Sequence, residues 1–140
     1  MNEQELRQAM ATLDLFRAQL ESIAENMQLI QVSLEELARA RETLAQYKGA
    51  GEDSEILVPI GGNSFVFAKV ASNSKAIVGI GTGVSVEKSM DEAIQTMESR
   101  ADELVETMKK LSERRNVLEA QATQLSQAVQ QEMQALQQQG

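Results

Sequence analysis

Apolar residues recur at alternating steps of three and four along the first third of the chain. This spacing selects twelve positions, of which eleven are apolar and one is arginine. The positions are Leu6, Ala9, Leu13, Phe16, Leu20, Ile23, Met27, Ile30, Leu34, Leu37, Arg41 and Leu44. A 3.5-residue repeat sustained over more than five heptads predicts a coiled-coil helix within residues 1–48.

The same repeat returns in the last third of the chain, where twelve of fourteen positions are apolar. The positions are Met90, Ile94, Met97, Ala101, Leu104, Met108, Leu111, Arg115, Leu118, Ala122, Leu125, Val129, Glu132 and Leu136. Ser89, followed three residues later by Glu92, has the spacing of a capping box. A second coiled-coil helix is therefore predicted over residues 89–140.

Each predicted helix carries one apolar seam that must be buried, either against the other helix or against another chain. Lys48 and Gly49 mark the end of the first helix, and we expect Gly49 to adopt a left-handed cap. The two helices are nearly equal in length, and the segment between them can reverse the chain. These features favour an antiparallel coiled coil within one chain. In that arrangement Arg41 and Arg115 interrupt the seam and set its register.

The segment between the helices is predicted to form two tandem β-hairpins. Four runs rich in β-branched and aromatic residues, 55–60, 64–70, 76–80 and 83–88, are separated by the turn formers GGN, ASNSK and GT. Pro59 lacks a backbone donor, so its strand is expected to be an edge strand or to be bulged there. The predicted fold is mainly α with a small β region, in one domain: helix 1–48, hairpins 49–88 and helix 89–140.

Both faces of the first predicted hairpin are apolar. Ile56 and Val58 alternate with Leu57, while Phe65 and Phe67 alternate with other apolar residues. Strands with two apolar faces are buried on both faces, and four short strands cannot achieve this alone. We interpret the hairpins as an oligomerisation platform whose missing cover comes from other chains, the alternative being a small self-contained sheet.

Composition removes several classes of function. The formal net charge is −8, from 21 acidic and 13 basic residues, which argues against binding to nucleic acid or an anionic membrane. Without cysteine or histidine, the chain has no disulfides, thiol catalysis or imidazole chemistry. No apolar run is long enough to span a bilayer, and the N-terminus lacks the pattern of a signal peptide. We therefore expect a cytoplasmic protein.

No motif in the chain predicts catalysis, a cofactor or a metal. The glycines of "VGIGTGVSV" suggest a dinucleotide fingerprint, but its third glycine would fall at Val84 and the element that follows is β. Paired acids such as Glu35–Glu36 and Asp91–Glu92 fit solvated helix faces better than a desolvated catalytic site. An enzyme is not expected.

The chain ends carry a different composition. Residues 116–140 contain nine glutamines, and their only charged side chains are Glu119 and Glu132. Met10, Leu15 and Met133 are apolar but lie outside the seam. Since helix ends open most easily, these residues suit promiscuous binding of apolar segments. The equally open alternative is that they are ordinary surface residues.

The central sequence "SEILVPIGGNSFVFAKV", with "AIVGIGTGVSVEKSMDEAI" after it, resembles the signature of the α-class subunit of prefoldin. The resemblance covers nearly the whole chain. A β-class subunit would be expected to have a single hairpin. The short, acidic chain without histidine or cysteine looks more like archaeal members than eukaryotic ones.

The resemblance implies an ATP-independent cochaperone without a cofactor. Two α subunits would join through their hairpins, and four β-class subunits would add to this platform to give a hexamer with six coiled-coil arms. Such a complex captures non-native polypeptides near the arm tips and passes them to a group II chaperonin.

Carried over to this sequence, the resemblance implies two groups of site residues. The assembly positions would be Ile56, Val58, Phe65, Phe67, Ile77, Val78, Val84 and Val86. The client-binding positions would be Met10, Leu15, Phe16, Val129, Met133 and Leu136. Two alternatives remain, a structural coiled-coil scaffold that binds folded partner helices and an accessory arm of an enzyme.

Overall fold

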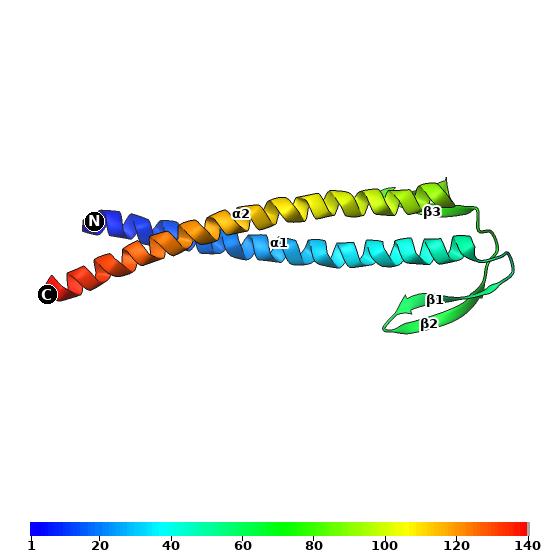
Figure 1. Ribbon diagram of the computed structural model, residues 1–140, viewed down its shortest axis with the longest axis horizontal. Helices are drawn as coiled ribbons and strands as arrows, with labels where there is room; N and C mark the ends of the chain where they lie inside the picture. The colour runs from blue at the N-terminus through cyan, green and yellow to red at the C-terminus, as the bar shows by residue number, and fades with distance from the viewer. Residues whose placement is uncertain (140) are drawn as a thin grey trace. The chain divides into compact units, whose positions relative to one another are not determined.

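The computed structural model describes residues 1–139 and confirms the predicted fold class, with two long helices separated by two antiparallel hairpins (Figure 1). The elements are α1 (Glu3–Gly49), β1 (Glu55–Gly61), β2 (Ser64–Lys69), β3 (Lys75–Gly81), β4 (Val84–Ser89) and α2 (Met90–Gln139). Contacts group the chain into two units. The terminal unit is Met1–Gln31 with the chain from Glu106 onward, and the central unit is Val32–Val105.

In the terminal unit, α1 and α2 run side by side in opposite directions. The Met1 amino group lies 3.2 Å from a carboxylate oxygen of Glu132, and Nη1 of Arg115 lies 3.9 Å from the sulfur of Met27. The buried side chains all belong to the predicted seam: Ala9, Leu13, Ile23, Leu118 and Val129. Burial at steps of three and four is what a coiled coil requires.

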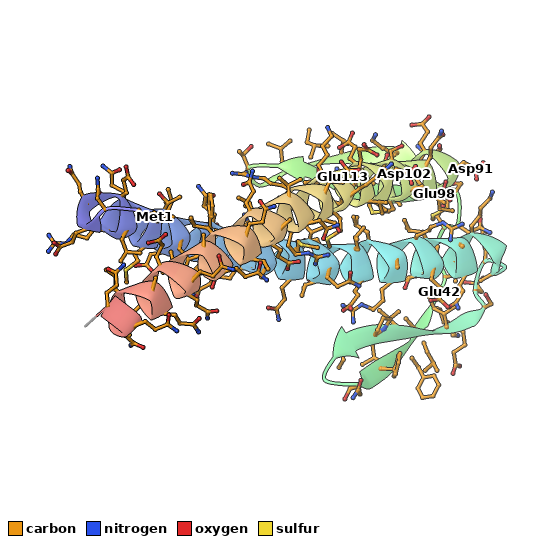
Figure 2. All side chains as sticks on the ribbon, turned by 60° about the vertical axis from the view of Figure 1, so that its left-hand side comes forward. Met1, Glu42, Asp91, Glu98, Asp102 and Glu113 are labelled. Carbon is orange, nitrogen blue, oxygen red and sulfur yellow. The ribbon has the colours of Figure 1, made fainter. Side chains whose placement is uncertain are left out.

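In the central unit the helices are also antiparallel, and Arg41 leaves the seam to pair with Glu98. Its Nε lies 2.7 Å from Oε1 of Glu98, and both side chains are about half exposed. Lys48 forms an ion pair with Asp91 in the same register; Glu98 and Asp91 are labelled in Figure 2. These exposed pairs fix register more than they add stability, because solvent screens them.

Polar caps close the helices, and one of them differs from the prediction. The Glu92 amide donates to Oγ of Ser89 at 3.2 Å, as expected for a cap at the start of α2. The prediction for Gly49 was wrong, because this glycine ends α1 without a left-handed φ. The Asn73 amide instead donates to the carbonyls of Lys48 (3.3 Å) and Ala50 (2.8 Å), so a distant loop caps the helix.

Each hairpin turns through two residues with positive φ, Gly62–Asn63 in the first and Thr82–Gly83 in the second. Two successive residues of this kind match the right-handed twist of a tight hairpin. The bulge expected near Pro59 is present, but hairpin β3–β4 has a bulge at the equivalent place without a proline. The bulge therefore comes from the turn geometry and not from the missing proline N–H.

Candidate assembly surface and arm surface

Hairpin β1–β2 exposes apolar side chains on both faces. Leu57, Phe65 and Phe67 lie on one face, and Phe67 is 75% exposed. On the other face Val66 is exposed, while its cross-strand partner Val58 is only half-buried. Within residues 1–139, no further strand pairs with the outer edges of this two-stranded sheet. Unpaired edges and apolar faces of this kind attract further strands.

Hairpin β3–β4 is fixed to α2. Nη2 of Arg100 donates to the carbonyl oxygen of Gly79 at 2.6 Å, and Nζ of Lys88 donates to Oγ1 of Thr96 at 3.4 Å. Val78 is only 2% exposed, whereas the neighbouring Ile77 is 78% exposed on the opposite face. The second hairpin therefore presents one covered face and one open face.

The predicted assembly residues differ in exposure within the single chain. Phe65, Phe67, Ile77 and Val84 are exposed, Ile56, Val58 and Val86 are half-buried, and Val78 is buried. The structure adds exposed apolar residues that the prediction omitted: Leu57, Ile60, Val66 and Ile80. The two-faced apolar pattern already contained this signal. Since the chain is alone, the role of these residues in assembly stays a prediction.

The predicted client-binding residues fall into two groups in the terminal unit. Met10, Leu15, Met133 and Leu136 are exposed, whereas Phe16 is half-buried and Val129 is buried in the seam. Leu136 is a seam position, but α2 continues past the contact of Glu132 with Met1, so its apolar side chain stays open. Phe16 and Val129 become available only where the helices separate.

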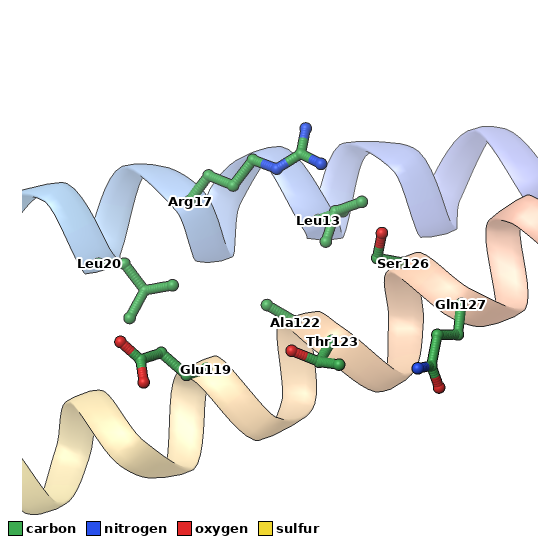
Figure 3. A pocket seen from close by; sticks show the side chains of 8 residues that line it. All are labelled: Leu13, Arg17, Leu20, Glu119, Ala122, Thr123, Ser126 and Gln127. Carbon is green, nitrogen blue, oxygen red and sulfur yellow. The ribbon is translucent and has the colours of Figure 1, made fainter.

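A hollow of about 470 Å³, open to solvent, lies along the seam of the terminal unit. Figure 3 shows Leu13 and Leu20 of α1 directed toward α2, where the small side chain of Ala122 faces them. Thr123 and Ser126 of α2 complete this thinly packed stretch. Small and polar residues remove dispersion contacts there, so this part of the arm is expected to open more easily than a fully packed seam.

Within residues 1–139, no three carboxylate, imidazole or thiol groups lie close enough together to hold a metal ion. Neither helix, over the same described residues, has an apolar stretch long enough to cross a membrane.

Solved structures share this fold. A cryo-EM structure of filamentous PFD from Methanocaldococcus jannaschii superposes with a TM-score of 0.68 at 24% identity, covering 87% of this chain and 98% of that one. A crystal structure of the prefoldin beta subunit from Thermococcus strain KS-1 superposes with a TM-score of 0.56 at 15% identity, covering 91% and 90%. At these identities the comparison establishes the fold alone.

Sequence comparison assigns the family. The prefoldin family, described as "Prefoldin subunit", matches residues 16–135. Prefoldin subunit alpha of Pyrococcus horikoshii is 38% identical over 110 residues, covering 78% of this chain and 74% of the relative. Prefoldin subunit alpha of Methanothrix thermoacetophila is 34% identical over 110 residues, covering 79% and 72%. The chain therefore belongs to the prefoldin family of chaperone subunits, and to its alpha class.

Proposed function

We propose that this chain is the α subunit of an ATP-independent cochaperone that holds non-native polypeptides. The observation that carries the proposal is the exposure of apolar side chains on both faces of hairpin β1–β2 in a member of a chaperone family. A single chain leaves many apolar side chains of these strands exposed, so other subunits must provide the remaining cover.

The proposed assembly places the hairpins of two copies against each other. Four β-class subunits then pair with this platform, giving a hexamer whose arms are the antiparallel helix pairs. A beta subunit of this family shares the fold of the present chain, which supports pairing through equivalent elements. Phe65, Phe67, Ile77 and Val84 are exposed and would make the first contacts.

Client polypeptides are proposed to bind at the ends of the arms. Met10, Leu15, Met133 and Leu136 offer flexible apolar side chains that adapt to different apolar segments. Phe16 and Val129 would join them when the helix ends separate. Each contact is weak, but several arms acting on one unfolded chain raise the effective concentration and hence the affinity.

Release requires no nucleotide in this mechanism. A group II chaperonin in the cytoplasm competes for the same apolar segments, and the client leaves as the separate weak contacts are replaced. The arms therefore act by holding and transfer, and the chaperonin carries out the folding.

A structural scaffold is the second candidate, and one observation favours it. Four further apolar residues are exposed outside the seam and away from the helix ends: Leu29 and Val32 of α1, and Val105 and Val117 of α2. A scaffold would use such residues to bind folded partner helices along the arm. It would show no preference for unfolded chains.

Serine substitutions at two matched sets of exposed apolar residues separate these candidates. The end variant combines Met10→Ser, Leu15→Ser, Met133→Ser and Leu136→Ser. The control combines Leu29→Ser, Val32→Ser, Val105→Ser and Val117→Ser, which changes four comparably exposed side chains on the same helices. Each variant is assembled with a β-class subunit, and suppression of client aggregation is measured without ATP. We expect the end variant to lose suppression and the control to keep it, with equal native masses. Full suppression by the end variant would overturn the assignment of the arm ends.

A further inference from the structure

The two hairpins form an internal repeat with a period of 20 residues. The Val70 amide donates to the Ser54 carbonyl at 3.0 Å, and 20 residues later the Met90 amide donates to the Ser74 carbonyl at 2.9 Å. The strand register, the bulge and the two-residue turn recur at the same places of the repeat. Each feature of one hairpin can therefore be compared with its counterpart in the other.

The equivalent faces of the two hairpins are covered to different degrees. In β3–β4 the cross-strand pair Val78 and Val86 faces inward, with Val78 buried and Val86 half-buried. Their counterparts are Val58, which is half-buried, and Val66, which is 44% exposed. Hairpin β1–β2 therefore lies less closely against the rest of the central unit than its repeat does.

A groove of about 940 Å³ occupies the space that closer packing would fill. The groove is lined by Arg39, Thr43 and Leu44 of α1, by Leu57, Val58, Pro59 and Phe65 of hairpin β1–β2, and by Ile77, Val78 and Met97. The groove thus separates the apolar hairpin from the helix that runs beside it.

Arg39 occupies a position on α1 that corresponds to that of Arg100 on α2. The pairing of Arg41 with Glu98 sets a register that places Arg39 and Arg100 at the same level of the two helices. Arg100 donates to the carbonyl of Gly79, and the repeat equivalent of Gly79 is Pro59. Arg39 lines the groove together with Pro59 and makes no hydrogen bond or ion pair within residues 1–139.

We propose that hairpin β1–β2 closes onto α1, with Arg39 donating to the Pro59 carbonyl as Arg100 does to that of Gly79. Closure covers Val58 in the unassembled chain, as Val78 is covered in the docked repeat, and leaves Phe67 open for a partner. The hairpin is therefore a clasp that reduces the exposed apolar surface before assembly. Closure is a property of the single chain, so it does not depend on the proposed chaperone activity.

Thiol labelling tests the clasp, because the natural chain contains no cysteine. Val58→Cys reports on hairpin β1–β2 and Val78→Cys on the docked repeat. Each is combined with Arg39→Ala or Arg100→Ala in the full chain, and the rate of reaction with a small thiol reagent is measured. We expect Arg39→Ala to raise the labelling rate at position 58 roughly two- to tenfold, as for loss of one hydrogen bond, and to leave position 78 unchanged. Arg100→Ala should have the converse effect.

Protein concentration separates closure within a chain from cover by a second copy. The clasp is supported if the cysteine at position 58 is protected from labelling, if Arg39→Ala relieves this protection, and if dilution of the protein does not change it. The clasp is overturned if the protection disappears on dilution, or if Arg39→Ala leaves the labelling rate unchanged. Far-UV circular dichroism of each variant confirms that the helices remain folded, and Arg39→Lys should retain part of the protection because it keeps a donor.

Discussion

Filling the hollow in the terminal unit should stabilise the arm. Ala122 faces Leu13 and Leu20 across a space of about 470 Å³ (Figure 3). Leucine at position 122 adds three carbon atoms, which can extend along this open hollow toward Leu13 and Leu20. The substitution also restores a large apolar residue to the heptad seam.

The expected gain follows from the area removed from water. Each buried methylene contributes about 0.8 kcal/mol, so three fully buried carbons would give roughly 2.4 kcal/mol. The hollow is open to solvent along the rim formed by Thr123 and Ser126, so about half of that value is realistic. We therefore expect Ala122→Leu to raise the free energy of unfolding by about 1 kcal/mol.

Chemical denaturation followed by far-UV circular dichroism measures this gain. Gln124→Leu is the matched control, because it adds an apolar side chain to the same helix at an exposed position outside the seam. The midpoint of unfolding should rise for Ala122→Leu with an unchanged denaturant slope, and should not rise for the control. A midpoint for Ala122→Leu at or below that of the control would refute the packing described for this seam.

Two further predictions concern the central unit. Replacing Asn73 with alanine removes both amide hydrogen bonds to the end of α1 and should lower the free energy of unfolding by about 1–2 kcal/mol. Asn73→Gln should recover little of this stability, because the longer side chain displaces the amide by one carbon. A double-mutant cycle of Arg41→Ala and Glu98→Ala should give a coupling free energy of only about 0.2–1 kcal/mol, because both side chains are about half exposed. This coupling should decrease as salt is added. A coupling that does not depend on salt would show that the pair is desolvated.

The helical part of the fold could be predicted from the sequence because burial follows the heptad repeat. Nearly every predicted seam position is buried or half-buried, and the exceptions have local causes. Arg41 turns outward to Glu98, and Leu136 lies where α2 extends past its contact with the start of the chain. The hairpin turns were also predictable, since Gly62, Asn63 and Gly83 favour positive φ, although Thr82 adopts it against the preference of a β-branched residue.

Contacts between distant residues could not be predicted in the same way. The cap of α1 comes from Asn73, a loop residue that local signals around Gly49 do not reveal. Val58 and Val78 occupy equivalent places in similar strands, yet only Val78 is buried. That difference arises because Arg100 and Lys88 tie the second hairpin to α2, an arrangement that strand patterns alone do not encode.

The two predicted sites differ in how far sequence could define them. Exposure of Phe65, Phe67 and Ile77 agrees with the apolar pattern of the hairpins. The arm ends have no comparable motif, and the six residues selected there divide between surface and seam. The proposed client binding would depend on an opened state of the helix ends, which residue spacing does not specify.

The native mass of the chain tests the central claim that the hairpins form the assembly surface. Light scattering is used on the chain alone and after addition of a single-hairpin β-class subunit. We predict a dimer that grows to a complex of two α and four β subunits. Phe65→Ser combined with Phe67→Ser should abolish both steps, whereas Leu29→Ser should abolish neither. The account would be contradicted if the mass did not change when the partner was added, and if self-association were lost on substitution of the helix seam but not on substitution of these phenylalanines.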